Sequence, residues 1–143
     1  MTTTTHVPTL EHGIHATNAW LRDVAAELDG ADHQEGYRAL RATMHVLRDR
    51  LPVDEAAQLA AQLPDLLRGV YYEGWDPSAT PVRFHTREQL LDRLMAEGAF
   101  HGHTEASYAF GAAMTVLRQR ISAGEMEDVA AVLPADVADF VSG

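Results

Sequence analysis

Two stretches decide the fold of this chain, because each reads as a copy of the other: Met44-His-Val-Leu-Arg-Asp-Arg50 and Met114-Thr-Val-Leu-Arg-Gln-Arg120. Both contain Met-x-Val-Leu-Arg-x-Arg, and they lie 70 residues apart. The same shift lays residues 36–70 over residues 106–140 without a gap, and each copy runs on to a Leu-Pro pair. Self-similarity at a fixed spacing is typical of repeated structural units. The sequence therefore predicts a tandem duplication.

The composition is that of an acidic globular protein. The 143 residues are 46% hydrophobic, with a formal net charge of −10 and no cysteine. The negative charge argues against nucleic acid or an anionic membrane as a partner, because both need a clustered basic surface. Without cysteine, disulfides, thiolate zinc sites and cysteine nucleophiles are excluded. The sequence shows no apolar run of the roughly 20 residues that span a bilayer and no signal-peptide pattern, so we expect a cytoplasmic protein.

The hydrophobic pattern is helical along the chain. One stripe recurs at steps of three and four, as on one face of a helix: Tyr37, Leu40, Met44, Leu47 and Leu51. No alternating β-branched run predicts a strand. We therefore predict an all-α fold of about eight helices, in two similar three-to-four-helix units packed around a pseudo-two-fold axis. Met44 and its copy Met114 should both be buried.

The repeat divides the chain into four predicted segments within one compact domain. They are a flexible N-terminus over residues 1–13, unit one over 14–70, an aromatic linker over 71–83 and unit two over 84–143. Linkers are usually small and polar. This one carries Tyr71, Tyr72 and Trp75. We expect it to be packed, with its aromatic side chains in the seam between the units.

Several runs of residues resemble a known family. They include Leu47-Arg48-Asp49-Arg50-Leu51, Ala60-Ala61-Gln62-Leu63-Pro64 and above all Tyr71-Tyr72-Glu73-Gly74-Trp75. These runs resemble the bacterial domain-of-unknown-function family 2267, and the resemblance extends from about Trp20 to the end of the chain. It implies an all-α, duplicated bacterial protein. It implies no activity, because the family has none assigned.

Six residues are candidates for a ligand or partner surface: Arg41, His45, Arg68, Tyr71, Tyr72 and Trp75. Arg41 and His45 belong to a basic helix face that the second copy lacks, because Gly111 and Thr115 stand at the shifted positions. Such a loss in one copy fits divergence toward a site in the other. The alternatives are a solvated face paired with acidic side chains, and seam packing for the aromatic residues.

No catalytic residue is predicted, since nucleophile, Walker-type and dinucleotide motifs are missing. His101 and His103 form a His-x-His, a spacing that can place two imidazoles on one metal. No third ligand stands at a helical spacing from them, so we expect neither a metal nor a cofactor.

Two arginines recur in both copies and suggest structural salt bridges. Arg48 and Arg50, with their copies Arg118 and Arg120, are predicted to pair with the repeated glutamates Glu55 and Glu125 and fix a helix corner.

We therefore expect a non-catalytic interaction or binding protein, with a protein or small-molecule partner that the sequence does not identify. One alternative is a small-molecule-binding or enzymatic domain that uses the cleft between the units. The other is a histidine metal-binding protein. A deep pocket with converging polar groups favours the first alternative, whereas a flat apolar surface favours an adaptor.

Overall fold

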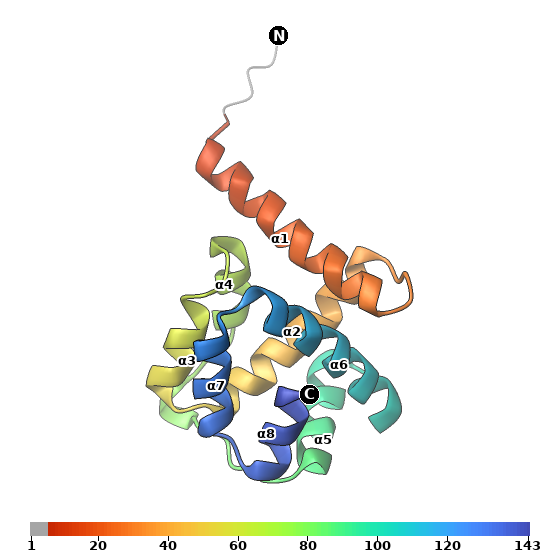
Figure 1. Ribbon diagram of the computed structural model, residues 1–143, viewed down its shortest axis with the longest axis vertical. Helices are drawn as coiled ribbons and strands as arrows, with labels where there is room; N and C mark the ends of the chain where they lie inside the picture. The colour runs from red at the N-terminus through yellow and green to blue at the C-terminus, as the bar shows by residue number, and fades with distance from the viewer. Residues whose placement is uncertain (1–5) are drawn as a thin grey trace.

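The computed structural model describes residues 6–143 and is all-α over that range, with eight α-helices and no strand, as the periodicity predicts (Figure 1). The first four helices are α1 (Pro8–Glu27), α2 (His33–Arg50), α3 (Val53–Ala60) and α4 (Asp65–Tyr72). After a short 3-10 helix, η1 (Pro77–Ala79), come α5 (Arg87–Gly98), α6 (His103–Arg120), α7 (Ala123–Ala131) and α8 (Ala135–Ser142).

The helix bounds follow the 70-residue shift closely. Helices α2 and α6 each have 18 residues and begin at positions 70 apart, His33 and His103. The packing is reciprocal as well, since α1 packs on α2 and α6 while α5 packs on α6 and α2. Helices α3 and α7 also pack on each other. These correspondences agree with a duplication, which remains a prediction, as does the pseudo-two-fold axis.

Local side-chain bonds fix where two helices begin. The Thr86 hydroxyl accepts a bond from the Gln89 backbone N–H while the Gln89 side chain bonds back to the Thr86 N–H, a reciprocal capping box at the start of α5. The Ser122 hydroxyl accepts from the Glu125 N–H at 3.2 Å and starts α7. Such caps satisfy backbone donors that the first turn leaves free.

Two boundaries differ from the sequence prediction. Helix α1 begins at Pro8, so residues 8–13 of the segment expected to be flexible are helical, and residues 1–5 of that segment lie outside the described residues. A proline in the first helical turn suits such a start, because its missing N–H has no partner there in any case. Helix α4 continues through Tyr72, so two aromatic residues assigned to the linker belong to a helix instead.

The core joins residues from both predicted units. Met44 and Met114 are 2% and 0% exposed, which confirms their predicted burial. Close approach of α1 and α2 depends on Gly36, where an added Cβ would lie 2.6 Å from the backbone oxygen of Leu21. Only glycine permits that contact without a shift of one helix.

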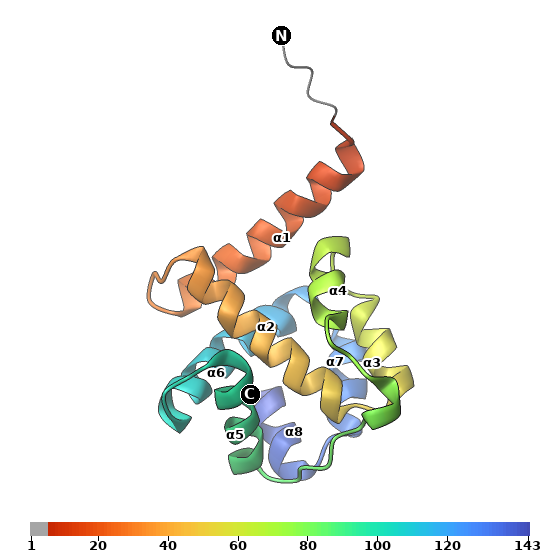
Figure 2. The ribbon, with the colours of Figure 1, turned by 180° about the vertical axis from the view of Figure 1, so that it is seen from behind.

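The linker between α4 and α5 runs around the end of α2 (Figure 2). The Val82 N–H donates to the Asp49 carbonyl at 2.6 Å, and the Arg50 Nε–H donates to the Phe84 carbonyl at 2.9 Å. Trp75 is partly buried and lies against Tyr72, with ring centroids 5.2 Å apart. The linker is therefore held at several points along its length.

The N-terminal half of α1 projects from the body of the protein (Figure 1). Three apolar residues along it are about half exposed or more: Val7, Leu10 and Ile14. Among the described residues, none of the helices has the length and apolar character needed to cross a membrane.

Candidate functional site

In unit one, the candidate residues Arg41 and His45 lie in a filled cluster of charged side chains. Arg41 Nη2 is 2.6 Å from Glu73 Oε1, and its Nη1 is 3.8 Å from Glu97 Oε2. The hydrogen bond to Glu73 raises the pKa of Arg41, and the same bond lowers the pKa of the Glu73 carboxyl. His45 is 2% exposed, and its Nε2–H donates to the Val70 carbonyl at 2.7 Å. Its Nδ1 lies 3.7 Å from the Glu97 carboxylate.

The other four candidates of unit one also bond or pack internally. The Arg68 guanidinium donates to the carbonyls of Ala60 and Leu63, both at 2.9 Å, and so caps the C-terminal end of α3. Tyr71 is fully buried, its hydroxyl donates to the Ala56 carbonyl at 2.7 Å, and burial raises its pKa. Tyr72 and Trp75 lie against each other, and the Trp75 indole N–H is buried without a hydrogen-bond partner in the described part of the chain.

In unit two, the corresponding place is a cavity of about 590 Å³. We name it the α6–α8 cavity and define it by six of its lining residues: Glu27, Gly111, Thr115, Arg118, Asp139 and Phe140. Arg87, Tyr108 and Met114 also line it. Its walls come from α6 and α8, with the C-terminal end of α1 and the start of α5 beside them.

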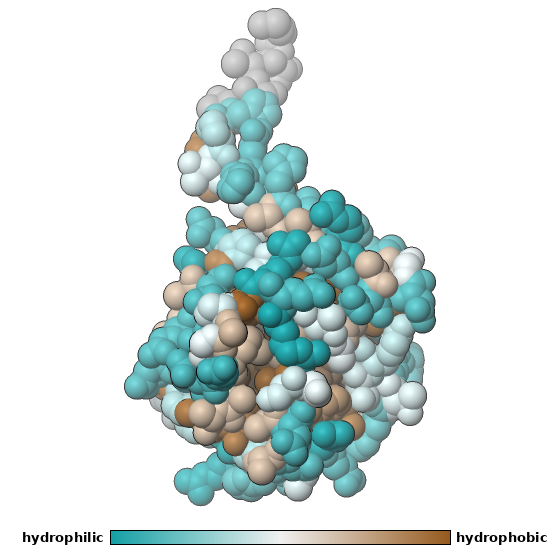
Figure 3. Space-filling view, viewed as in Figure 1, coloured by the Kyte–Doolittle hydropathy of each residue, from teal (hydrophilic) through white to brown (hydrophobic). Residues whose placement is uncertain are grey.

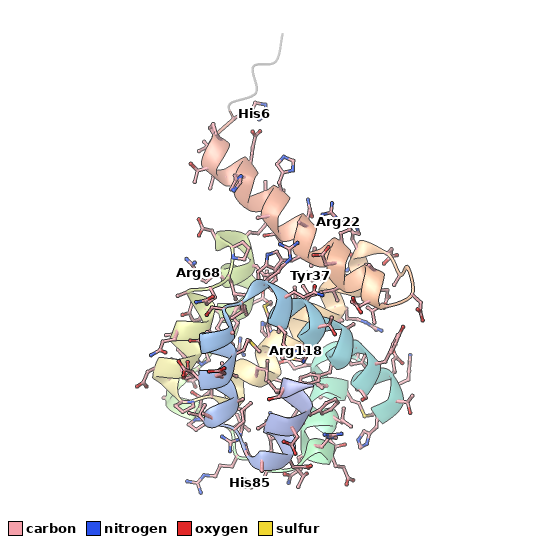
Figure 4. All side chains as sticks on the ribbon, in the orientation of Figure 1. His6, Arg22, Tyr37, Arg68, His85 and Arg118 are labelled. Atoms are coloured by element: carbon pink, nitrogen blue, oxygen red, sulfur yellow. The ribbon has the colours of Figure 1, made fainter. Side chains whose placement is uncertain are left out.

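Figure 4 places Arg118 near the centre of the face where α6, α7 and α8 meet. Figure 3 shows the same face with hydrophobic surface gathered in its lower half, over α7 and α8. A smaller hollow of about 400 Å³, lined by Met126 and Val141 among others, borders Arg118 as well.

The cavity exists because small residues replace large ones at the shifted positions. Gly111 and Thr115 stand where unit one has Arg41 and His45. A Cβ added at Gly111 would meet no atom within 4 Å, so nothing else has moved in to fill that space. The glutamate partner is retained, because Glu27 is shifted by 70 residues from Glu97. The second unit thus keeps the acidic wall of the unit-one cluster without the cation that pairs with it.

Arg118 has fewer partners than Arg48, its counterpart in unit one. Both donate from Nη1 to a carbonyl near the end of the last helix of their unit, Arg48 to Tyr71 at 2.7 Å and Arg118 to Val141 at 2.8 Å. Arg48 also bonds the Asp49 carboxylate at 2.8 Å and is 3% exposed. Arg118 is half-buried, and no carboxylate of the described residues lies within 4.0 Å of its guanidinium.

Charges of both signs therefore line the cavity without pairing. Glu27 and Asp139 have no basic partner within 4.0 Å among residues 6–143. The Arg87 guanidinium lies over the Phe140 ring at 4.4 Å and likewise forms no ion pair there. Two arginines and two carboxylates held apart around one hollow can each receive a ligand group of opposite charge.

The predicted arginine–glutamate salt bridges are wrong. Glu55 and Glu125 contact each other where α3 meets α7, and each has a buried carboxylate oxygen without a partner among the described residues. Burial, and next the contact with Glu55, raises the pKa of Glu125 to about 7. Arg120 instead bonds Asp23 at 2.6 Å. The arginines project toward helix-terminal carbonyls and α1, whereas the glutamates face each other, so shared repetition did not imply contact.

The histidines lie in separate places. His103 Nε2 is 2.6 Å from the Asp92 carboxylate, a pair between α6 and α5. Within residues 6–143, no group of three or more His, Asp or Glu side chains is arranged to hold a metal ion.

Comparison with known proteins gives a family and no activity. The model of the family described as "Uncharacterized conserved protein (DUF2267)" matches residues 17–140. No curated protein matches the chain.

Proposed function

The chain belongs to the DUF2267 family, and we propose that this member is a non-catalytic binding module whose small-molecule ligand occupies the α6–α8 cavity. One observation carries the proposal: the space that Arg41 and His45 occupy in unit one is empty in unit two, while charged groups still surround it. Burying or leaving charges unpaired is unfavourable, and a ligand that pairs with them removes that cost.

The size and lining of the cavity suit a small molecule. Its volume of about 590 Å³ lies within the range of roughly 300–1,000 Å³ typical of ligand pockets. Met114 and Phe140 supply apolar contact, and Tyr108 and Arg118 supply hydrogen-bond donors. No serine, threonine or histidine in it is paired with a base as nucleophilic catalysis requires, so binding is the simpler proposal.

The test compares ligand retention by wild type and by a variant with the cavity filled. Gly111→Arg restores the unit-one residue at the shifted position. Gly69→Arg makes the same change at an exposed position of α4, where an added Cβ also meets nothing within 4 Å. Each protein is incubated with a small-molecule extract of cells, passed through a desalting column and analysed by mass spectrometry. We expect wild type and Gly69→Arg to retain the same molecule and Gly111→Arg to lose it. Equal retention by all three would reject the cavity as the site.

A protein partner is a second candidate, because Val7, Leu10 and Ile14 form an exposed apolar stripe at steps of three and four on the projecting half of α1. Replacing Leu10 and Ile14 with glutamine should abolish recovery of that partner in affinity purification, while the cavity variants leave recovery unchanged. Recovery that survives the double change would remove this candidate. Both candidates keep the prediction of a cytoplasmic protein without nucleic-acid or membrane partners, which the net charge of −10 supports.

A further inference from the structure

Unit one contains a guide to the ligand chemistry of unit two. There the guanidinium of Arg41 lies between two carboxylates, 2.6 Å from Glu73 and 3.8 Å from Glu97. The side chain that delivers this cation comes from α2, and the Glu97 carboxylate comes from α5. The cluster shows which chemical group satisfies a glutamate in this position of the fold.

Unit two retains the acceptor and lacks the donor. Glu27, at the C-terminal end of α1, corresponds to Glu97, and Gly111 of α6 corresponds to Arg41. Glu27 lines the cavity and has no basic partner within 4.0 Å among the described residues. A second carboxylate, that of Asp139 on α8, lines the same space. A cationic group of a ligand therefore fits where unit one holds the Arg41 guanidinium.

The opposite charge is missing at Arg118. Its counterpart Arg48 bonds a carboxylate, that of Asp49, but the residue after Arg118 is Gln119. The Arg118 guanidinium makes one short bond, to the Val141 carbonyl, and a weak one of 3.5 Å to the Thr115 hydroxyl. Guanidinium has five N–H donors in a planar fork that matches a carboxylate. An anionic group of the same ligand fits here.

We propose that the α6–α8 cavity binds a small zwitterion, in which a guanidinium or ammonium group pairs with Glu27 and a carboxylate pairs with Arg118. The inference rests on the proposed function and specifies the class of ligand. The buried Met114 and the partly buried Phe140 contact the carbon chain between the two charged groups. Free amino acids with a basic side chain belong to this class, and L-arginine reproduces the Arg41 side chain with a carboxylate added.

Isothermal titration calorimetry at low salt tests the inference with three matched probes. L-Arginine carries both charged groups, L-citrulline replaces the guanidinium with a neutral urea of the same shape, and agmatine lacks the carboxylate. We expect wild type to bind L-arginine at least about tenfold more tightly than either of the other two, since each lost charge pair is worth about one factor of ten. Binding of all three with equal affinity would overturn the inference.

Glu27→Gln keeps the shape of the side chain and removes its charge. Because Glu27 lies at the rim of the cavity, the variant should fold as wild type does, which circular dichroism checks. We expect it to bind L-arginine no more tightly than L-citrulline while it still prefers L-arginine to agmatine. If Glu27→Gln discriminates between arginine and citrulline as wild type does, the assignment of the cation to Glu27 is wrong.

The closed variant separates failure of this inference from failure of the proposed function. Gly111→Arg should bind none of the probes, and Gly69→Arg should bind them as wild type does. If wild type ignores all three probes yet retains another molecule that Gly111→Arg loses, the zwitterion inference falls and the binding function stands. If wild type retains no molecule that Gly111→Arg loses, both fall.

Discussion

Replacing Glu125 with glutamine should stabilise the protein at pH 8 and change its stability little at pH 5. The pKa of Glu125 is raised from 4.5 to about 7, first by burial and then by the contact with Glu55. Between those two values the folded protein binds more protons than the unfolded chain, so its stability falls as the pH rises through this window. Glutamine resembles the protonated acid and cannot ionise, so the variant escapes that loss.

The magnitude follows from the size of the pKa shift. One pKa unit corresponds to about 1.36 kcal/mol, so the shift of Glu125 sets a ceiling of about 3 kcal/mol. Glu125 is 8% exposed and lies near the protein surface, so solvent screening reduces the expected gain to about 1 to 2 kcal/mol at pH 8. In a protein of this size that raises Tm by about 3 to 8 °C.

Thermal melts followed by circular dichroism at pH 5 and pH 8 measure the effect. Glu127→Gln is the matched control, because it removes the same charge from an exposed position on the same helix. The reasoning predicts a rise in Tm at pH 8 for Glu125→Gln that disappears at pH 5, and no such pH dependence for Glu127→Gln. A gain of equal size at both pH values, or a loss of stability at pH 8, would refute the account of the Glu55–Glu125 contact.

Three further substitutions test the packing by urea unfolding. Gly36→Ala should cost about 1 to 2 kcal/mol because its Cβ would lie 2.6 Å from the Leu21 oxygen, although Gly→Ala usually stabilises a helix; a gain in stability would contradict the close approach. Tyr71→Phe should cost about 1 kcal/mol by leaving the Ala56 carbonyl unbonded, and no change would show that this bond contributes nothing. Trp75→Ala should cost about 2 to 3 kcal/mol, less than loss of a fully buried tryptophan, since the ring is only partly buried against Tyr72; a neutral change would remove it from the packing.

Local sequence signals predicted the helices well because they act within one turn. The steps of three and four around Met44 require a helix with one buried face, and the Thr86–Gln89 capping box starts α5 by bonds between residues three apart. The end of α4 was misplaced because Gly69 and the aromatic pair after it read as a linker. Tyr71 lies four residues after the buried Leu67, and this spacing could have extended the helix.

The candidate site was harder to predict, because it consists partly of side chains that are absent. Charged and aromatic residues drew attention to Arg41 and His45 in unit one, where the structure gives them internal partners. The cavity lies at Gly111 and Thr115, which carry no chemical signal alone. Their importance depends on Glu97 of α5, which approaches Arg41 only in the folded chain and shows what unit two lacks.

The central claim, that the α6–α8 cavity binds a small molecule, is tested most directly by two-dimensional ¹H–¹⁵N NMR of the protein with and without a small-molecule extract of cells. The two units supply an internal control. The account predicts that the backbone signals of Gly111 and Thr115 and the Arg118 Nε–H signal shift, while those of Arg41, His45 and Arg48 stay in place. Shifts confined to unit one, or the absence of any shift at Gly111 and Thr115, would contradict it.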